Sequence, residues 1–199
     1  MTAILIVAGV GASIAVATLR GPRAATQDPT LVEGGFGTLA TVVRAIDRER
    51  NPDDAISDEL ASHLENLIST GVITRDAINL SRRVFEAPEI GPVYVLPSDT
   101  GFVVVSSYGI MSVIGGLGST NPVAGFFGQG DLATDPPGLA YTYGVAMDDV
   151  EGVDVVYQDR VFPATMVENG YVWISPDSEM QIDSLHLQVR LSDGSIINM

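Results

Sequence analysis

The spacing of hydrophobic positions divides the chain into three stretches with different periods. Residues 3–19 are apolar or small and carry no charge. Between positions 36 and 68 the apolar residues recur at intervals of three and four, which predicts amphipathic helices. From position 82 onward, short apolar runs are separated by Gly, Pro, Asn and Asp, which predicts β-strands joined by turns. The pattern therefore predicts an apolar leader, a helical segment at 36–81 and a β-rich domain at 82–199.

The leader has two interpretations that the sequence leaves open. A spanning helix needs about 17–25 residues, so positions 3–19 can just cross a bilayer. A cleaved signal peptide fits as well, because Ala15-Val16-Ala17 has the A-x-A form of a cleavage site. We expect residues 1–23 to be a membrane anchor or signal segment and the polar residues 24–35 to be a tether. Membrane contact would then run through residues 3–19, with the body of the protein outside the cytoplasm. Against this orientation, Arg20 and Arg23 follow the apolar stretch and no basic residue precedes it.

The same stretch has a competing interpretation as the first strand and phosphate-binding turn of a dinucleotide fold. Gly9-Val10-Gly11 would be the turn, but the third glycine of the G-x-G-x-x-G motif would fall at Ile14. Small residues inside a membrane helix explain these glycines more simply.

The helical segment is expected to contain two amphipathic helices and a short turn. The first covers 36–50. The second has Asn51 as its cap and Pro52 at its first position, and it ends at Gly71, which suits a left-handed C-terminal residue. Thr74 can cap a further short turn at 75–81. Core packing is the favoured role for the apolar stripe of the second helix, which comprises Ile56, Leu60, Leu64, Leu67 and Ile68.

The β-rich domain is expected to be a mainly antiparallel β-sandwich or a partly open barrel. Asn169-Gly170 is its strongest hairpin signal, because both residues tolerate positive φ. Residues 108–138 are the longest stretch without clear periodicity, and their glycines and prolines predict a long loop. Long loops on a β scaffold are common places for function. The expected strands are 82–86, 93–96, 101–107, 141–146, 153–158, 160–167, 171–175, 185–191 and 196–198.

Several short motifs resemble those of a group of uncharacterised actinobacterial proteins that are secreted or anchored by one N-terminal segment. The motifs are SRRV (81–84), VYVLP (93–97), GFVVV (101–105), YGVAMDDV (143–150), VDV (153–155) and VENGYV (167–172). Met147 and Asp149 stand where that group has a proline and a glycine, and the cysteine pair that many of its members carry is missing. The resemblance implies an extracytoplasmic location and a β fold, and it implies no activity.

Composition narrows the possible functions. The net charge of −15 repels nucleic-acid phosphates, so nucleic acid is not an expected partner. The absence of cysteine removes disulfides, thiolate nucleophiles and thiolate metal sites. His63 and His186 are interpreted as structural, and the spacing of the acidic residues 148–154 does not match an EF-hand loop. We therefore expect no catalytic, cofactor-binding or metal-binding residues.

The remaining expectation is an envelope-associated binding or interaction module whose partner is an envelope protein or the cell wall. Its contact surface is placed in the predicted loop and on aromatic rings expected to be exposed, because such rings give rigid contact area. A pilin-like structural subunit and an extracytoplasmic hydrolase, acting in a cleft under 108–138, are the alternatives. The predicted contact residues are Gly116, Gly118, Asn121, Phe126, Phe127, Tyr141 and Tyr143.

Overall fold

The computed structural model describes residues 36–114, 116–129 and 139–199. The predicted leader and tether at 1–35, and positions 115 and 130–138 of the predicted loop, lie outside the described residues. Within the described ranges, no helix has both the length and the hydropathy needed to cross a bilayer.

The β-strands form three antiparallel sheets of four strands each, so the prediction of a mainly antiparallel β fold is confirmed. Sheet 1 has the order β1-β2-β3-β4, sheet 2 the order β5-β6-β10-β9, and sheet 3 the order β12-β11-β7-β8. The strands of sheet 1 are β1(Arg82–Ala87), β2(Gly91–Ser98), β3(Gly101–Ser106) and β4(Gly109–Ile114). Those of sheet 2 are β5(Val123–Gln129), β6(Ala140–Ala146), β9(Thr165–Val167) and β10(Gly170–Ile174). Those of sheet 3 are β7(Val150–Tyr157), β8(Arg160–Pro163), β11(Leu185–Leu191) and β12(Ile196–Asn198).

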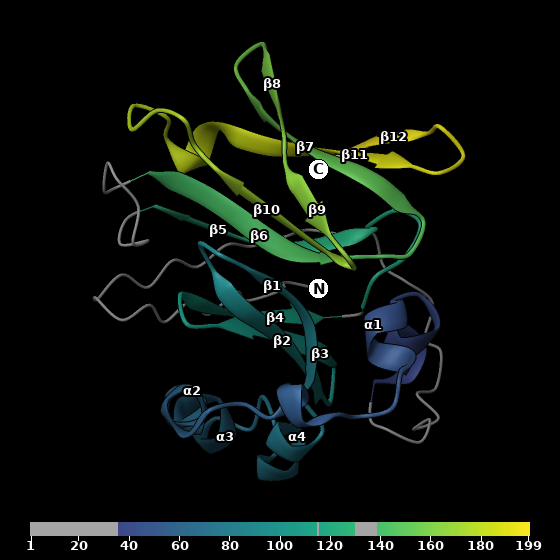
Figure 1. The fold of residues 1–199 in the computed structure, drawn as a ribbon, viewed down its shortest axis with the longest axis vertical. Coiled ribbons are helices and arrows are strands. Elements are labelled where there is room, and N and C mark those ends of the chain that lie inside the picture. The colour runs from purple at the N-terminus through teal and green to yellow at the C-terminus, as the bar shows by residue number, and fades with distance from the viewer. Residues whose placement is uncertain (1–35, 115, 130–138) are drawn as a thin grey trace.

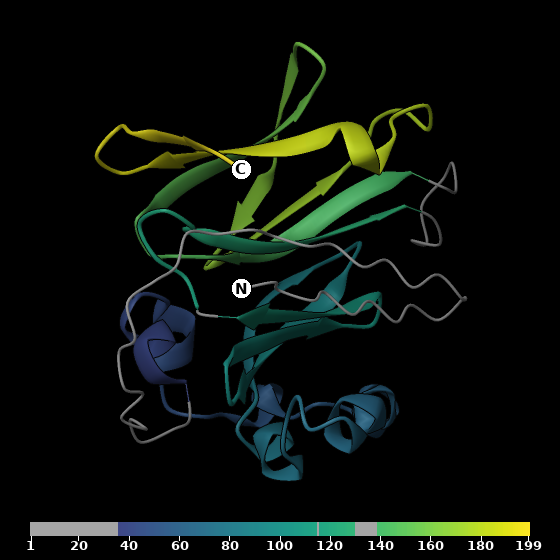
Figure 2. The same ribbon diagram turned by 180° about the vertical axis from the view of Figure 1, so that it is seen from behind.

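The three sheets lie face to face, with sheet 2 in the middle (Figures 1 and 2). One apolar core lies between sheets 1 and 2, and a second lies between sheets 2 and 3. Sheets 1 and 2 are therefore covered on both faces, and β6 is buried along its whole length. The described residues cover sheet 3 on one face only, and β11 alternates between buried and more exposed residues. This difference explains why some strands are continuous apolar runs in the sequence whereas others alternate.

Short helices cover the outer face of sheet 1 and one end of the core between sheets 1 and 2 (Figure 1). They are the 3₁₀ helix η1(Gly37–Thr41), α1(Arg44–Asp47), η2(Pro52–Asp54), α2(Asp58–His63), α3(Glu65–Ser69) and α4(Arg75–Asn79), and a further 3₁₀ turn, η3(Ile182–Ser184), precedes β11. The prediction of two longer helices is wrong, because each is broken into short pieces. The predicted caps at Asn51 and Thr74 are confirmed, as is the left-handed conformation of Gly71, whose φ is +73°.

The second predicted helix is interrupted because Asp54 turns inward. A new helix, capped by Ser57, then begins at Asp58. The Asp54 carboxylate is fully buried and accepts two hydrogen bonds from the Arg48 guanidinium, at 2.7 and 2.6 Å. It also accepts from the backbone N–H groups of Asn51 and Arg83, at 2.8 Å each. These bonds join α1, η2 and β1. Burial by itself would raise the pKa of Asp54, but the Arg48 guanidinium and the two backbone donors lower this pKa to about 2.

The predicted loop at 108–138 contains two strands, β4 and β5, and this part of the prediction is wrong. The strands are hard to detect because glycines stand where a side chain would meet an aromatic ring. A Cβ on Gly109 would lie 2.8 Å from the Phe126 ring, and one on Gly125 would lie 2.8 Å from Cζ of Tyr171. The tertiary packing therefore selects glycine inside strands, against the usual strand preferences.

The hairpin predicted at Asn169-Gly170 exists, but its turn is shifted by one residue. Gly170 pairs with Val167, so the connecting residues are Glu168 and Asn169, and Glu168 has the positive φ of 49°. Gly170 is a strand residue, and a Cβ there would overlap the ring of Phe85.

Asn169 is buried and attaches α1 to the sheets. Its side-chain oxygen accepts from the Ala45 N–H at 3.0 Å, and its amide nitrogen donates to Asp148 at 2.7 Å. Asp148 in turn accepts from the Arg44 N–H at 2.9 Å. The first turn of α1 is thus satisfied by residues more than a hundred positions away in sequence.

Candidate functional site

Most of the aromatic rings predicted to form an exposed contact surface are buried. Phe126, Tyr141 and Tyr143 are 4%, 6% and 1% exposed and lie between sheets 1 and 2. The ring centroids of Phe126 and Tyr143 are 5.4 Å apart, and those of Tyr141 and Tyr143 are 6.3 Å apart. Phe127 points to the opposite face of sheet 2 and is half-buried against the second core. The expectation of an exposed aromatic surface is therefore wrong for these rings, because sheet 2 is covered on both sides.

The Tyr143 hydroxyl makes polar contacts within this buried cluster. The hydroxyl groups of Tyr143 and Ser106 share a hydrogen bond of 2.7 Å between sheets 2 and 1. Burial raises the pKa of the Tyr143 hydroxyl, which stays protonated. The pair therefore joins two sheets.

Gly116, Gly118 and Asn121 are half-buried and form a small turn of their own. Gly118 and Asn121 exchange backbone hydrogen bonds of 3.1 and 2.8 Å, and Gly116 has a positive φ of 78°. A role for these three residues in contacting a partner stays a prediction.

The ionisable residues considered in the sequence do not converge. His63 and His186 are exposed, on α2 and on β11 respectively. Asp148 is engaged with α1, and Asp154 pairs with Arg190 at 3.2 Å. Within the described ranges, no group of three or more His, Asp or Glu side chains is arranged to hold a metal ion.

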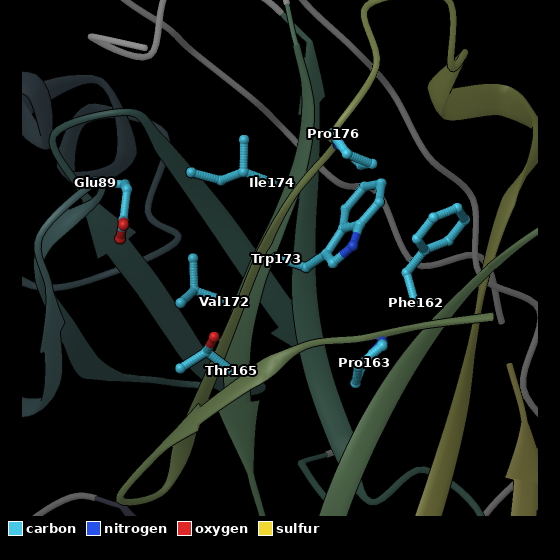
Figure 3. A pocket seen from close by; sticks show the side chains of 8 residues that line it. All are labelled: Glu89, Phe162, Pro163, Thr165, Val172, Trp173, Ile174 and Pro176. Carbon is cyan, nitrogen blue, oxygen red and sulfur yellow. The ribbon is translucent and has the colours of Figure 1, made fainter. Parts of the chain in front are cut away.

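A groove of about 370 Å³ opens beside β10, where β9 stops pairing with it (Figure 3). Side chains from both faces of β10 reach this groove. Figure 3 shows Glu89, Thr165, Val172 and Ile174 on one side of the strand and Phe162, Pro163, Trp173 and Pro176 on the other. The groove thus lies along the edge of sheet 2, between the β1–β2 turn and β8.

The path of the chain between β8 and β9 creates this groove. The pairing of β9 with β10 covers Gly170 to Val172 and ends at the pair Val172 and Thr165. Ala164 then donates its N–H to the Val153 carbonyl at 2.8 Å, which draws the chain away to sheet 3. The last part of β10 is left with β6 as its only neighbouring strand among the described residues.

Aromatic packing fixes one wall of the groove. The ring centroids of Phe162 and Trp173 are 5.9 Å apart at an interplanar angle of 54°. The Arg160 guanidinium carbon lies 4.8 Å from the centroid of Phe162. Trp173 is 6% exposed, so its ring is held in place by its neighbours. The opposite wall carries Glu89, which is exposed and comes from the turn between β1 and β2.

The sequence pattern does not predict this groove. Residues 160–167 read as one continuous strand, whereas the structure bends the chain at Ala164 and divides the run between two sheets. The proline at position 163 was the local sign of that bend, because proline interrupts a ladder of hydrogen bonds.

The described lining of the groove is mainly apolar, which suits binding of a ligand. Among the described residues that line the groove, Glu89 is the one with an ionisable side chain and Thr165 the one with a side-chain hydroxyl. The described lining residues place no histidine or lysine beside the Thr165 hydroxyl.

Comparisons with protein-family models, curated proteins and solved structures give no match for this chain. The resemblance to actinobacterial envelope proteins thus stays a hypothesis.

Proposed function

We propose that this protein is an envelope-associated binding module whose ligand occupies the groove beside β10. The observation that carries the proposal is the wall formed by Phe162 and Trp173, which is held rigid and opens onto a groove with a carboxylate on its other side. Rigid aromatic side chains bind at low conformational cost because few bond rotations are lost on contact.

The location is the second part of the proposal. An uncharged stretch at 3–19, followed by a polar tether, supports a single membrane anchor or a signal segment in front of the β-rich body. Cell fractionation combined with protease accessibility tests this part. Digestion of the body in intact spheroplasts is expected. Protection until the cells are lysed would refute the location and leave the groove proposal standing.

Site-specific photo-crosslinking in living cells tests the binding function. A photoreactive amino acid replaces Thr165, which is exposed and lines the groove, in the full chain. The matched control replaces Ile196, which is 56% exposed on sheet 3, away from the groove. We expect a discrete adduct from position 165, none from 196, and a lower yield when Phe162→Ala is added. Equal labelling from both positions, or none from either, would contradict a ligand in the groove.

A further inference from the structure

We infer that the groove takes up an extended polypeptide segment, which adds to sheet 2 as a short strand beside β10 and presents a basic side chain to Glu89. This inference rests on the proposed binding function and specifies the ligand and its mode of binding.

The first support is the edge of β10 at Ile174, which has no partner strand on the β9 side among the described residues. Alternate residues of an antiparallel strand bond to opposite neighbours. The N–H of Ser175 donates to the Ala140 carbonyl at 2.7 Å, on the β6 side, so the N–H and C=O of Ile174 face the other way. In the part of the chain that the structure describes, no strand pairs with Ile174 on that side. Ile174 is half-buried, and a strand edge that lacks a partner strand is a template for an added strand.

The second support is that this chain already places a strand on the same edge. β9 pairs antiparallel with β10 and leaves the sheet at Ala164. A ligand segment that continued the line of β9 would pair with the residues of β10 after Val172, in the register that β9 already sets. It would be short, because Pro176 has no N–H to donate and ends the ladder.

The third support is the arrangement of side chains, which defines the pattern of the ligand. Thr165 lies opposite Val172, and the two side chains lie on the same side of β10 (Figure 3). Ile174 is two residues beyond Val172, so its side chain lies on the same face of sheet 2. A ligand residue opposite Ile174 would point to that face, which also carries Glu89. Its two neighbours would point to the side of Phe162 and Trp173. The groove therefore fits a sequence in which a basic residue is flanked by apolar ones.

The net charge of the protein favours the same ligand. At −15, the chain attracts a cationic segment at long range and repels an acidic one. Glu89 then supplies the local contact that fixes which ligand position must be basic.

The test uses the fluorescence of Trp173, which is the one tryptophan in the sequence and lines the groove. The probe is an acetylated and amidated pentapeptide of valine and threonine with a central arginine, titrated into the full chain. A second peptide carries an N-methyl group on the central residue, and a third has glutamate in place of arginine. The protein variants are Glu89→Arg and, as a control on sheet 3, Ile196→Thr.

We expect a saturable change in fluorescence with the arginine peptide and about tenfold weaker binding after N-methylation, because one backbone hydrogen bond is lost. Glu89→Arg should weaken the arginine peptide and strengthen the glutamate peptide, each by about two- to fivefold, whereas Ile196→Thr should change neither. Equal binding of the N-methylated peptide would overturn strand addition while the binding function stands. Failure of all three peptides, together with a discrete adduct at position 165, would overturn the peptide ligand alone. Failure of both experiments would overturn the proposed function as well.

Discussion

Gly125→Ala should destabilise the protein through a steric conflict with one identified ring. An added Cβ would overlap the hydroxyl oxygen of Tyr171 and lie 2.8 Å from its Cζ and 3.4 Å from the carbonyl oxygen of Tyr143. Tyr171 is fully buried between sheets 2 and 3, so its ring cannot move out into solvent. Overpacking of this kind costs about 1–3 kcal/mol, of which about 0.4–1 kcal/mol is offset by the lower entropy of the unfolded chain.

The same geometry predicts that Tyr171→Phe partly rescues Gly125→Ala. The Tyr171 hydroxyl oxygen is buried and makes no hydrogen bond of ordinary geometry, so its removal alone should change the free energy of unfolding by less than about 1 kcal/mol. In the double variant the hydroxyl conflict is gone and the 2.8 Å contact with the ring remains. The coupling free energy between the two substitutions should therefore be about 1 kcal/mol or more, in the stabilising direction.

Urea unfolding followed by Trp173 fluorescence measures all four corners of this double-mutant cycle. Gly118→Ala is the matched control, because a Cβ there would meet nothing within 4 Å. It should be close to neutral and should not couple to Tyr171→Phe. An equal loss of unfolding free energy from Gly125→Ala in both backgrounds, or no loss at all, would refute the steric conflict with Tyr171.

Three further predictions concern the buried polar contacts and the groove. Because the folded pKa of Asp54, about 2, lies below its unfolded value, its contribution to stability is complete above about pH 4 and is lost as the pH falls from 4 to 2. That contribution is at most about 2.5 kcal/mol. The free energy of unfolding, measured at pH 5 and pH 2.5, should therefore fall less for Asp54→Asn than for the wild type, and an equal fall would contradict the role of Asp54. Asn169→Ala leaves the Ala45 N–H without its partner and should lower the free energy of unfolding by about 1–3 kcal/mol. Hydrogen exchange at Ala45 should speed up more than exchange in the sheets, and an unchanged rate at Ala45 would contradict this role of Asn169. Phe162→Ala removes the ring packed on Trp173 and should move the Trp173 emission to longer wavelength with little loss of stability, whereas an unshifted spectrum would show that Phe162 does not shield that wall.

The sequence identified the features that depend on neighbouring residues. Asn51 and Thr74 cap their helices as predicted, Gly71 takes the left-handed conformation, and the last two strands have the predicted bounds. Caps, left-handed glycines and the alternation of a sheet with one exposed face are local effects of backbone geometry and solvent contact. They can therefore be read along the chain without knowledge of its partners in space.

The site could not be predicted in this way, because it depends on how three sheets are stacked. The rings chosen from the sequence as exposed are buried because sheet 2 has a neighbour on each face. The glycines that made residues 108–138 look like a loop include positions in β4 and β5 that face aromatic rings. The groove exists because Ala164 bonds to a strand of sheet 3 and leaves β10 incompletely paired.

From the sequence alone follow the acidic charge, the apolar stretch at 3–19, the caps of the short helices and the mainly antiparallel β character of the rest. Tertiary structure alone decided which strands share a sheet, which aromatic rings are buried and where, among the described residues, a strand edge has no partner strand. The physical reason is that the hydrophobic pattern of a strand shows only that successive side chains point to opposite faces of its sheet. Whether water, a helix or another sheet covers each side is settled by contacts between residues that are far apart in the chain.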